Sequence, residues 1–264
     1  MPRLPRDWLG PLAGALGSAA FALARGPRMM ASANLRTVLG RSDAGTVRRM
    51  FVHNAEYYLS LFSPRPKGFS VAGHDLHGWE HFREALALGR GCILASPHVG
   101  DINYYAELFV ASGLPVNVLV EDIRPPELSR LVAHLRARRG VHVIVGGRGA
   151  LRDVYRALDR NEIVGLISDR TVDGSGEPVR FFGRCATLPD IALAIGARRK
   201  TPVIFGAAVR LETGRIVADI RPHFIPTADL PGETQRMAGT FEEFIRRWPD
   251  QWLAFQPVFG GGHG

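Results

Sequence analysis

The chain has 264 residues, of which 46% are hydrophobic and 22% are charged. This composition indicates a globular protein with a sizeable core, made of one large domain or of a domain with a small appendage. The formal net charge is +8, and all but two of the 33 basic residues are arginine, which favours anionic partners such as phospholipid headgroups, a phosphorylated cofactor or nucleic acid. The two cysteines lack metal-ligand spacing, so a disulfide framework is not indicated.

The first apolar segment, residues 8–24, contains no charged side chain and is rich in glycine and alanine. It is flanked by Arg3 and Arg6 on one side and by Arg25 and Arg28 on the other. The segment is short for a membrane-spanning helix. Three interpretations remain open: a helix lying on or partly in a membrane, a secretory signal, or an ordinary buried first helix.

A Pro-rich, polar stretch at residues 63–70 separates this helical part from a region of alternating strands and helices. The predicted division is therefore a helical, membrane-associating region over residues 1–66 and an α/β domain over residues 67–264. Within the second region, apolar runs and helical spacing predict strands at 91–96, 115–120, 141–145, 162–168, 202–209 and 215–220, and helices at 99–112, 126–139, 149–160, 189–199 and 233–247.

Repeated strand–helix units of this kind predict an α/β fold with a mixed, largely parallel sheet flanked by helices. Sites in such sheets gather beyond the carboxyl ends of the strands. His98 follows the strand at 91–96, and Asp169 follows the strand at 162–168. Both residues are therefore candidates for the site.

Several known motifs are absent: G-x-S-x-G, the Walker A lysine motif, and a strand followed by G-x-G-x-x-G. The sequence "HGWEH" at 77–81 matches H-x-x-E-H, a zinc protease signature, and His74 lies nearby. The match is short, and the segment leads into the amphipathic "FREALALG". A solvated helix start is the favoured interpretation, and no bound metal is expected.

His98 lies in "SPHVGDIN", where Pro97 and Gly100 suit the start of a helix directly after a strand. The positive end of a helix dipole favours a neutral imidazole, and a neutral imidazole can accept a proton as a general base. This local pattern fits equally well a histidine that caps a helix or fills a pocket mouth. Both interpretations stay open on the local residues.

Four blocks of sequence resemble a known family when they are taken in order. They are "GRGCILASPHVGDIN", "VLVEDIRPPELSRLVAHLRARRGVHVI", "GLISDRTVDGSGEPVRFFGRCATLPDIALAIGARRKTPVI" and "FEEFIRRWPDQWLAFQPVF", with "NLRTVLG" at 34–40 as a further match. The family is that of the bacterial lipid A biosynthesis (lauroyl/myristoyl) acyltransferases, which includes phosphatidylinositol mannoside acyltransferases. The resemblance covers nearly the whole chain.

The resemblance implies a glycerolipid-acyltransferase-like fold and an O-acyltransferase. Such enzymes transfer a fatty acyl chain from acyl-CoA or acyl carrier protein to a hydroxyl of a membrane glycolipid or phospholipid. It further implies a peripheral or monotopic protein at an anionic membrane surface, on the cytoplasmic face of the inner membrane. We expect no permanently bound cofactor. Nucleic acid is not an expected partner, because the basic residues are accompanied by no known nucleic-acid-binding motif and by no interleaved aromatic residues.

By the same resemblance, His98 is the general base, and the acid that orients it stands five residues later. Here that position holds Asn103, which can hold a tautomer but supplies no negative charge to an imidazolium. Asp101 and Glu177 are the first candidates for the missing carboxylate, although Glu121 and Asp169 could also approach. The alternative function is a catalytically degenerate member that binds lipid or acyl carrier without turnover.

The other motif blocks supply candidates for substrate binding, namely Glu121, Asp169 and Arg170. Arg170 suits a phosphate or the oxygen charge of a transition state, and equally a structural pair with Asp169. Arginines also crowd the segment 124–139, where they predict either a solvated helix face or phosphate binding: Arg124, Arg130, Arg136, Arg138 and Arg139.

Overall fold

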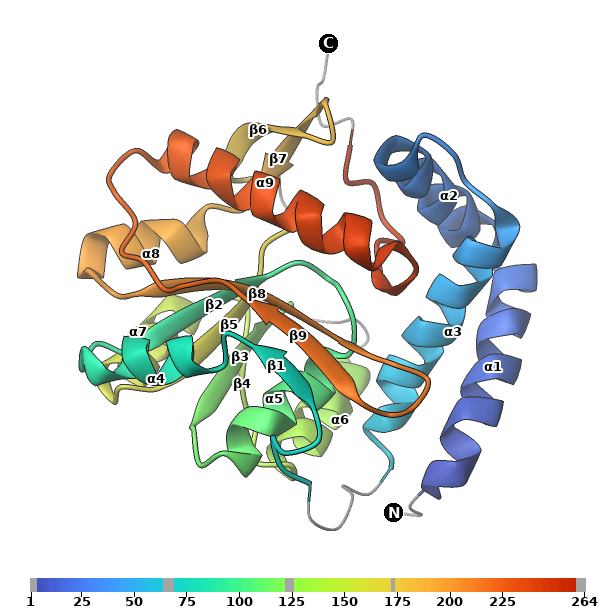
Figure 1. Cartoon of the computed structure of the whole chain (residues 1–264), viewed down its shortest axis with the longest axis horizontal. Coiled ribbons are helices and arrows are strands. Elements are labelled where there is room, and N and C mark those ends of the chain that lie inside the picture. The colour runs from blue at the N-terminus through green and yellow to red at the C-terminus, as the bar shows by residue number, and fades with distance from the viewer. Residues whose placement is uncertain (1–3, 64–68, 122–125, 172–173, 260–264) are drawn as a thin grey trace.

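The computed structural model describes residues 4–63, 69–121, 126–171 and 174–259. The predicted boundary between residues 66 and 67 lies outside these ranges. Three helices come first, α1 (Arg6–Leu23), α2 (Arg25–Leu39) and α3 (Ala44–Ser60), and they stand together at one side of the sheet domain (Figure 1). The Asp43 side chain caps α3 by accepting a hydrogen bond from the Thr46 N–H at 2.8 Å.

Helix α1 packs closely against α3 at Gly17. A Cβ atom at this position would lie 2.5 Å from the Cα of Val52, so no larger residue fits there without a shift. Leu9 and Ala13 are also buried, whereas Trp8, Leu16 and Leu23 are exposed. Among the helices in the described ranges, none combines the length and apolar character that a bilayer-crossing segment needs. Residues 8–24 thus lie mostly in a helix with one buried and one exposed side, and its association with a membrane stays a prediction.

Seven strands form the main sheet, in the order β1-β9-β8-β2-β5-β3-β4. Neighbouring strands are parallel except for β8 and β9, so the prediction of a mixed, largely parallel sheet is confirmed. The strands are β1 (Asp75–His77), β2 (Cys92–Ser96), β3 (Val116–Val120), β4 (His142–Val145), β5 (Ile163–Ile167), β8 (Val203–Arg210) and β9 (Ile216–Ile220).

Helices cover both faces of the sheet. Side chains alternate along β2, so that Ile93 and Ala95 join the core beneath α7, α8 and α9, while Cys92 and Leu94 join the core beneath α4 and α5. The helices are α4 (Glu80–Ala87), α5 (Ile102–Ala111), α6 (Pro126–Ala137), α7 (Ala150–Asp159), α8 (Ile191–Arg199) and α9 (Leu230–Arg247).

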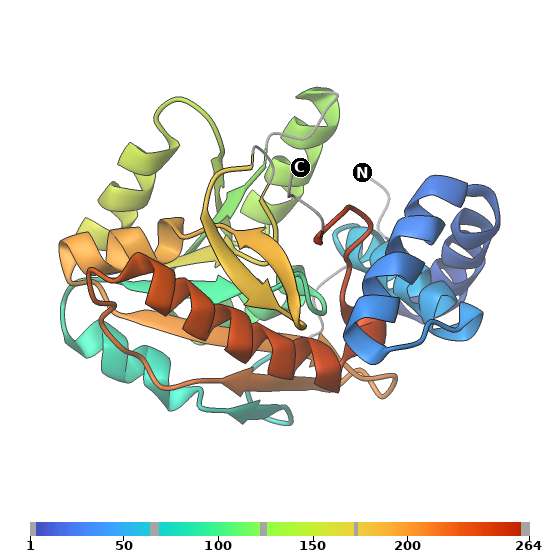
Figure 2. The ribbon, with the colours of Figure 1, turned by 90° about the horizontal axis from the view of Figure 1, so that it is seen from above.

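Three short strands were not predicted. Strands β6 (Glu177–Phe181) and β7 (Arg184–Leu188) form a separate antiparallel hairpin, which lies against α9 (Figure 2). Strand β1 occupies part of the H-x-x-E-H segment, with Gly78 at φ +79° between this strand and the residues before α4. His77 therefore lies in a strand and His81 in a helix, so the two do not share one helix face. The described residues hold no group of three or more side chains that could bind a metal ion.

Candidate active site

His98 and Asp169 meet at the carboxyl edge of the sheet. They follow β2 and β5, which are parallel neighbours with Ser96 opposite Ile167. The Ser168 N–H donates to the Ser96 carbonyl at 2.9 Å and continues this pairing past the strand ends. His98 Nδ1 lies 2.6 Å from Asp169 Oδ1. The register of two adjacent strands thus brings the imidazole and the carboxylate together.

The partner determines which ring nitrogen of His98 carries the proton. An ionised carboxylate only accepts hydrogen bonds, so Nδ1 is the donor, and in the neutral ring Nε2 keeps its lone pair. Burial alone would raise the pKa of the Asp169 carboxyl, but the charge of His98 and hydrogen bonds from His98 and Trp252 outweigh burial and lower that pKa. The His98 side chain is 25% exposed and that of Asp169 1%, so only the histidine can be reached from outside.

His98 lies in a turn before α5 rather than at the first turn of this helix. The helix was predicted from residue 99, but it begins at Ile102 with Asp101 as its N-cap. Gly100 sits between them at φ +76°, where a Cβ atom would lie 1.9 Å from the Ala208 carbonyl oxygen. His98 thus precedes the N-cap of α5, and the hydrogen bond to Asp169 orients its ring.

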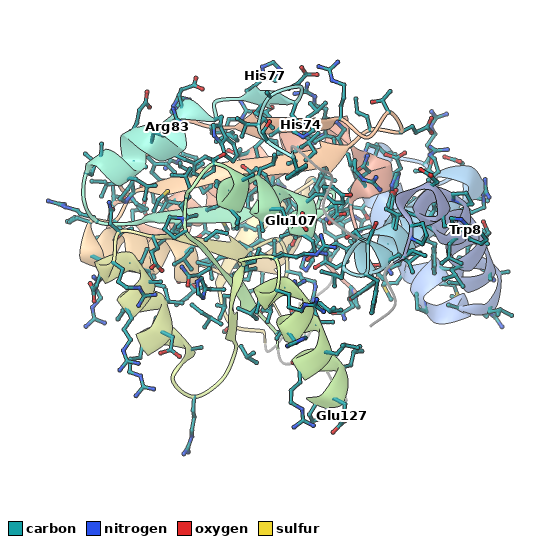
Figure 3. All side chains as sticks on the ribbon, turned by 90° about the horizontal axis from the view of Figure 1, so that it is seen from below. Trp8, His74, His77, Arg83, Glu107 and Glu127 are labelled. Carbon is teal, nitrogen blue, oxygen red and sulfur yellow. The ribbon has the colours of Figure 1, made fainter. Side chains whose placement is uncertain are left out.

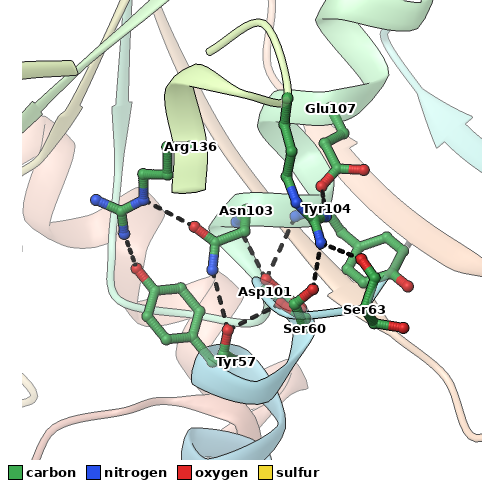
Figure 4. A network of polar contacts seen from close by, with 9 residues as sticks. Tyr57, Ser60, Ser63, Asp101, Asn103, Tyr104, Glu107 and Arg136 are labelled. Atoms are coloured by element: carbon green, nitrogen blue, oxygen red, sulfur yellow. Dashed lines mark hydrogen bonds and ion pairs between the residues drawn. The ribbon is translucent and has the colours of Figure 1, made fainter. Parts of the chain in front are cut away.

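Asn103 forms its side-chain hydrogen bonds with residues of α3 and α6 (Figure 4). Its Nδ2 donates to the Tyr57 carbonyl at 3.0 Å, and its Oδ1 accepts from Arg136 Nε at 2.9 Å. The Arg136 guanidinium also donates to the Tyr57 hydroxyl. The expectation that Asn103 orients the imidazole is therefore wrong for this structure, because both ends of its amide are bound to other groups.

Neither Asp101 nor Glu177, the two favoured carboxylates, is the hydrogen-bond partner of the His98 ring. The Asp101 Oδ1 accepts from the N–H groups of Asn103 and Tyr104 at 3.1 and 3.3 Å, so this side chain caps α5. Burial raises the pKa of Asp101 to about 7. Glu177 begins strand β6, opposite Leu188 in the hairpin. The carboxylate that the histidine uses is that of Asp169, which sequence reasoning had ranked below both.

Glu121 and Arg170 are brought together at the same edge. Glu121 follows β3, the other neighbour of β5, and its Oε1 lies 2.8 Å from Arg170 Nη2. The pair joins two of the predicted substrate-binding residues, and Asp169 is occupied by His98 and Trp252 instead of pairing with Arg170. A role of Glu121 and Arg170 in substrate binding stays a prediction.

The arginines of the α6 region divide into two groups. Arg130 and Arg138 are exposed, as predicted for a solvated helix face. Arg136 is buried, and Arg139 is nearly so, with an ion pair to Glu107 and hydrogen bonds to the carbonyls of Ser60 and Ser63. Arg124 lies outside the described residues. The two buried guanidinium groups thus link α3, α5 and α6, and the prediction of a solvated face is wrong for them.

Trp252 is the residue of this site whose role the sequence did not reveal. It is fully buried, and its Nε1 donates to Asp169 Oδ2 at 2.8 Å. Its signal was present in the family-like sequence "PDQW" at 249–252, but nothing in that block pointed to a contact with residue 169.

An apolar cavity lies beside this site, between α5 and the strands β2, β3 and β5. Its volume is about 20 Å³, and Ser96, Ile102, Phe109, Val116, Gly165 and Ile167 are among its lining residues. A space of this size holds about one water-sized sphere, so it has no room for a fatty chain in the described conformation.

Comparison with known proteins supports the family resemblance of the four sequence blocks. The model of the family described as bacterial lipid A biosynthesis acyltransferase matches residues 1–260. A phosphatidylinositol mannoside acyltransferase of Mycolicibacterium smegmatis is 26% identical over 92% of this chain and 84% of its own length. One of Mycobacterium tuberculosis is 23% identical over 91% of this chain and 79% of its own length. The chain therefore belongs to the bacterial lipid A biosynthesis acyltransferase family.

Proposed function

We propose that the protein transfers a fatty acyl chain from an acyl thioester to a hydroxyl of a membrane glycolipid or phospholipid, with His98 as the general base. The donor is acyl-CoA or acyl carrier protein. One observation carries the proposal: the hydrogen bond between His98 Nδ1 and Asp169 Oδ1, which leaves Nε2 of a partly exposed ring as a proton acceptor.

The chemistry follows from this geometry. Nε2 of His98 takes the proton of the acceptor hydroxyl as its oxygen attacks the thioester carbonyl, and the Asp169 carboxylate stabilises the imidazolium that forms. The tetrahedral intermediate then expels the thiolate, which is protonated by Nε2 of the His98 imidazolium, so that His98 returns to its neutral form. An ester forms and a thioester is cleaved, without an acyl-enzyme.

The degenerate alternative rested on Asn103, which lacks the negative charge of the usual acid. Asp169 supports the proposal of an active enzyme, since its buried carboxylate forms a hydrogen bond with the His98 ring.

Substitution of His98 tests the proposal. We expect His98→Ala to lower the rate of acyl transfer about 10²- to 10⁴-fold, because the hydroxyl loses its base. The measurement is release of CoA or of carrier-protein thiol, with product lipid identified by mass spectrometry. His134→Ala, which alters an exposed histidine of α6, is the matched control and should keep full activity. Equal rates for wild type and His98→Ala with both donors would refute the base.

The location we propose is peripheral, with α1 and α2 resting on an anionic bilayer. Trp8, Leu16, Leu23 and Met29 are between 48% and 83% exposed, and Trp8 lies at the outer edge of these helices (Figure 3). Basic residues beside them, such as the exposed Arg25, suit acidic headgroups.

Vesicle sedimentation checks this location. Burying one leucine side chain contributes about 1.5–3 kcal/mol. We therefore expect Leu16→Ser/Leu23→Ser to weaken binding to vesicles with anionic lipid by at least about tenfold. The control pair Leu88→Ser/Ile191→Ser removes exposed apolar side chains from the end of α4 and the start of α8, at the far side of the molecule, and should leave binding unchanged (Figure 1). Equal loss in both pairs would contradict the assignment to α1 and α2.

A further inference from the structure

Both oxygens of the Asp169 carboxylate are engaged by ring N–H groups. Oδ1 accepts from His98 Nδ1 at 2.6 Å, and Oδ2 accepts from Trp252 Nε1 at 2.8 Å. The indole is fully buried, and the carboxylate is 1% exposed. Because the terminal torsion of an aspartate is broad, one hydrogen bond alone leaves the carboxylate free to rotate. A donor on each oxygen restricts that rotation.

The segment that carries Trp252 also holds the backbone of His98. Val99 and Trp252 form an isolated antiparallel bridge. The Leu253 N–H donates to the His98 carbonyl at 2.8 Å, and the Gly100 N–H donates to the Gln251 carbonyl at 2.9 Å. Residues 251–256, here called the closing segment, therefore touch both members of the pair. One reaches the segment through its main chain and the other through the indole.

A buried amide in α2 holds the closing segment in turn. Asn34 is 2% exposed, and its Nδ2 donates to the carbonyls of Ala254 and Gln256 at 3.0 and 2.8 Å. Phe255 packs against Phe51 of α3, with 4.8 Å between ring centroids. The position of Trp252 is thus defined from both sides, by residues 98–100 and by the helices α2 and α3.

We propose that Trp252 is a positioning residue for the reaction: its indole N–H holds the Asp169 carboxylate so that Oδ1 stays on His98 Nδ1. The inference rests on the proposed role of His98 as the base. Trp252 also packs against Phe182 and Phe259, with 6.4 and 6.5 Å between ring centroids. The positioning role can be separated from this packing, because a phenylalanine at position 252 would keep an aromatic ring but would lack the N–H donor.

The first test is Trp252→Phe. We expect kcat to fall about 10- to 100-fold with little change in KM, because a hydrogen bond to a charged, catalytically coupled group is lost and the carboxylate can turn away. The acidic limb of the pH–rate profile should move to higher pH, because Asp169 without the indole takes up a proton more readily. Trp248→Phe is the matched control. Trp248 lies at the end of α9, stacks on Arg247, and should leave both readouts unchanged.

A second replacement separates the donor from the volume of the ring. Incorporating 3-benzothienylalanine at position 252 substitutes sulfur for the indole N–H at nearly constant size. It should reproduce the kinetic effect of Trp252→Phe if the donor is what matters. Full activity with this analogue would overturn the proposal even if Trp252→Phe folds poorly.

A spectroscopic readout distinguishes failure of this proposal from failure of the proposed function. The Nδ1 proton of His98 should give a far-downfield proton resonance that is absent in His98→Ala. It should be shifted or broadened in Trp252→Phe and unchanged in Trp248→Phe. That pattern without acyl transfer by any form would support the positioning and refute the reaction. Transfer by wild type with an identical resonance and pH profile in Trp252→Phe would overturn the positioning alone.

Discussion

Replacing Asp169 by asparagine is expected to lower turnover about 10⁴-fold while the protein stays folded, by analogy with the same change in a serine protease triad. The amide can offer an N–H to the imidazole and so favour the tautomer with the proton on Nε2, where the acceptor hydroxyl needs a lone pair. It also removes the negative charge that stabilises the imidazolium. Single-turnover acyl transfer at saturating donor measures this loss directly. A decrease below tenfold would show that Asp169 does not serve His98.

Asn103→Asp is the informative companion variant. It restores the acid at the family position, but that side chain points to Tyr57 and Arg136, so it should neither raise the rate of wild type nor rescue Asp169→Asn.

The pH dependence of stability gives a second check on the role of Asp169. The pKa of Asp169 is lower in the folded state than in the unfolded state. The ionised carboxylate therefore stabilises the fold at pH values above its unfolded pKa of about 3.9, and this stabilisation is lost as the pH falls through its folded pKa. The difference in free energy of unfolding between wild type and Asp169→Asn should therefore narrow below about pH 4.

Glu107→Ala is expected to destabilise the fold by about 3–5 kcal/mol, because it leaves the guanidinium of Arg139 buried without its carboxylate. The side chain of Glu107 is 1% exposed and that of Arg139 12%, and the pair ties α5 and α6 to the end of α3 through Ser60 and Ser63 (Figure 4). Urea unfolding followed by circular dichroism measures the change.

Glu127→Ala provides the matched control on the surface. Its partner Arg130 lies 2.9 Å away, but both side chains are more than 70% exposed, so the loss should stay within about 1 kcal/mol. The double variant Glu107→Leu/Arg139→Met should recover part of the lost stability, since no buried charge is left without its partner, while the carbonyls of Ser60 and Ser63 lose the donors of Arg139. A loss for Glu107→Ala no larger than the surface control would contradict this account of the buried pair.

Most of the sheet could be predicted because its strands are short apolar runs bounded by turns and helical patterns. β2, β3, β4, β5, β8 and β9 all lie where the sequence placed strands, within a residue or two. The hairpin β6–β7 was missed because its strands alternate buried and exposed residues, with exposed Arg180 between buried Val179 and Phe181, and so lack a continuous apolar run. The strand β1 was missed because three residues carry too little periodicity to distinguish a strand from the start of a helix.

The site was predicted only in part, for a reason of topology. His98 and Asp169 could each be placed at the end of a strand, but β2 and β5 are adjacent in the sheet while β3 and β4 come between them in the chain. A single sequence does not reveal which strands are neighbours in the sheet. The burial of Arg136 and Arg139 was missed for a related reason: a helix pattern assigns arginine to solvent unless the partners on other elements are known.

The closing segment also has a consequence for the order of folding. Asn34 and Ala254 are 220 residues apart in the chain, and joining them requires closure of a very long loop, whose entropic cost grows with its length. Such distant contacts form slowly compared with local ones. We therefore expect the hydrogen bonds from Asn34 to the closing segment to form late in folding. Local opening of residues 251–256 in the native protein would release the Asp169 carboxylate from the indole without unfolding the sheet.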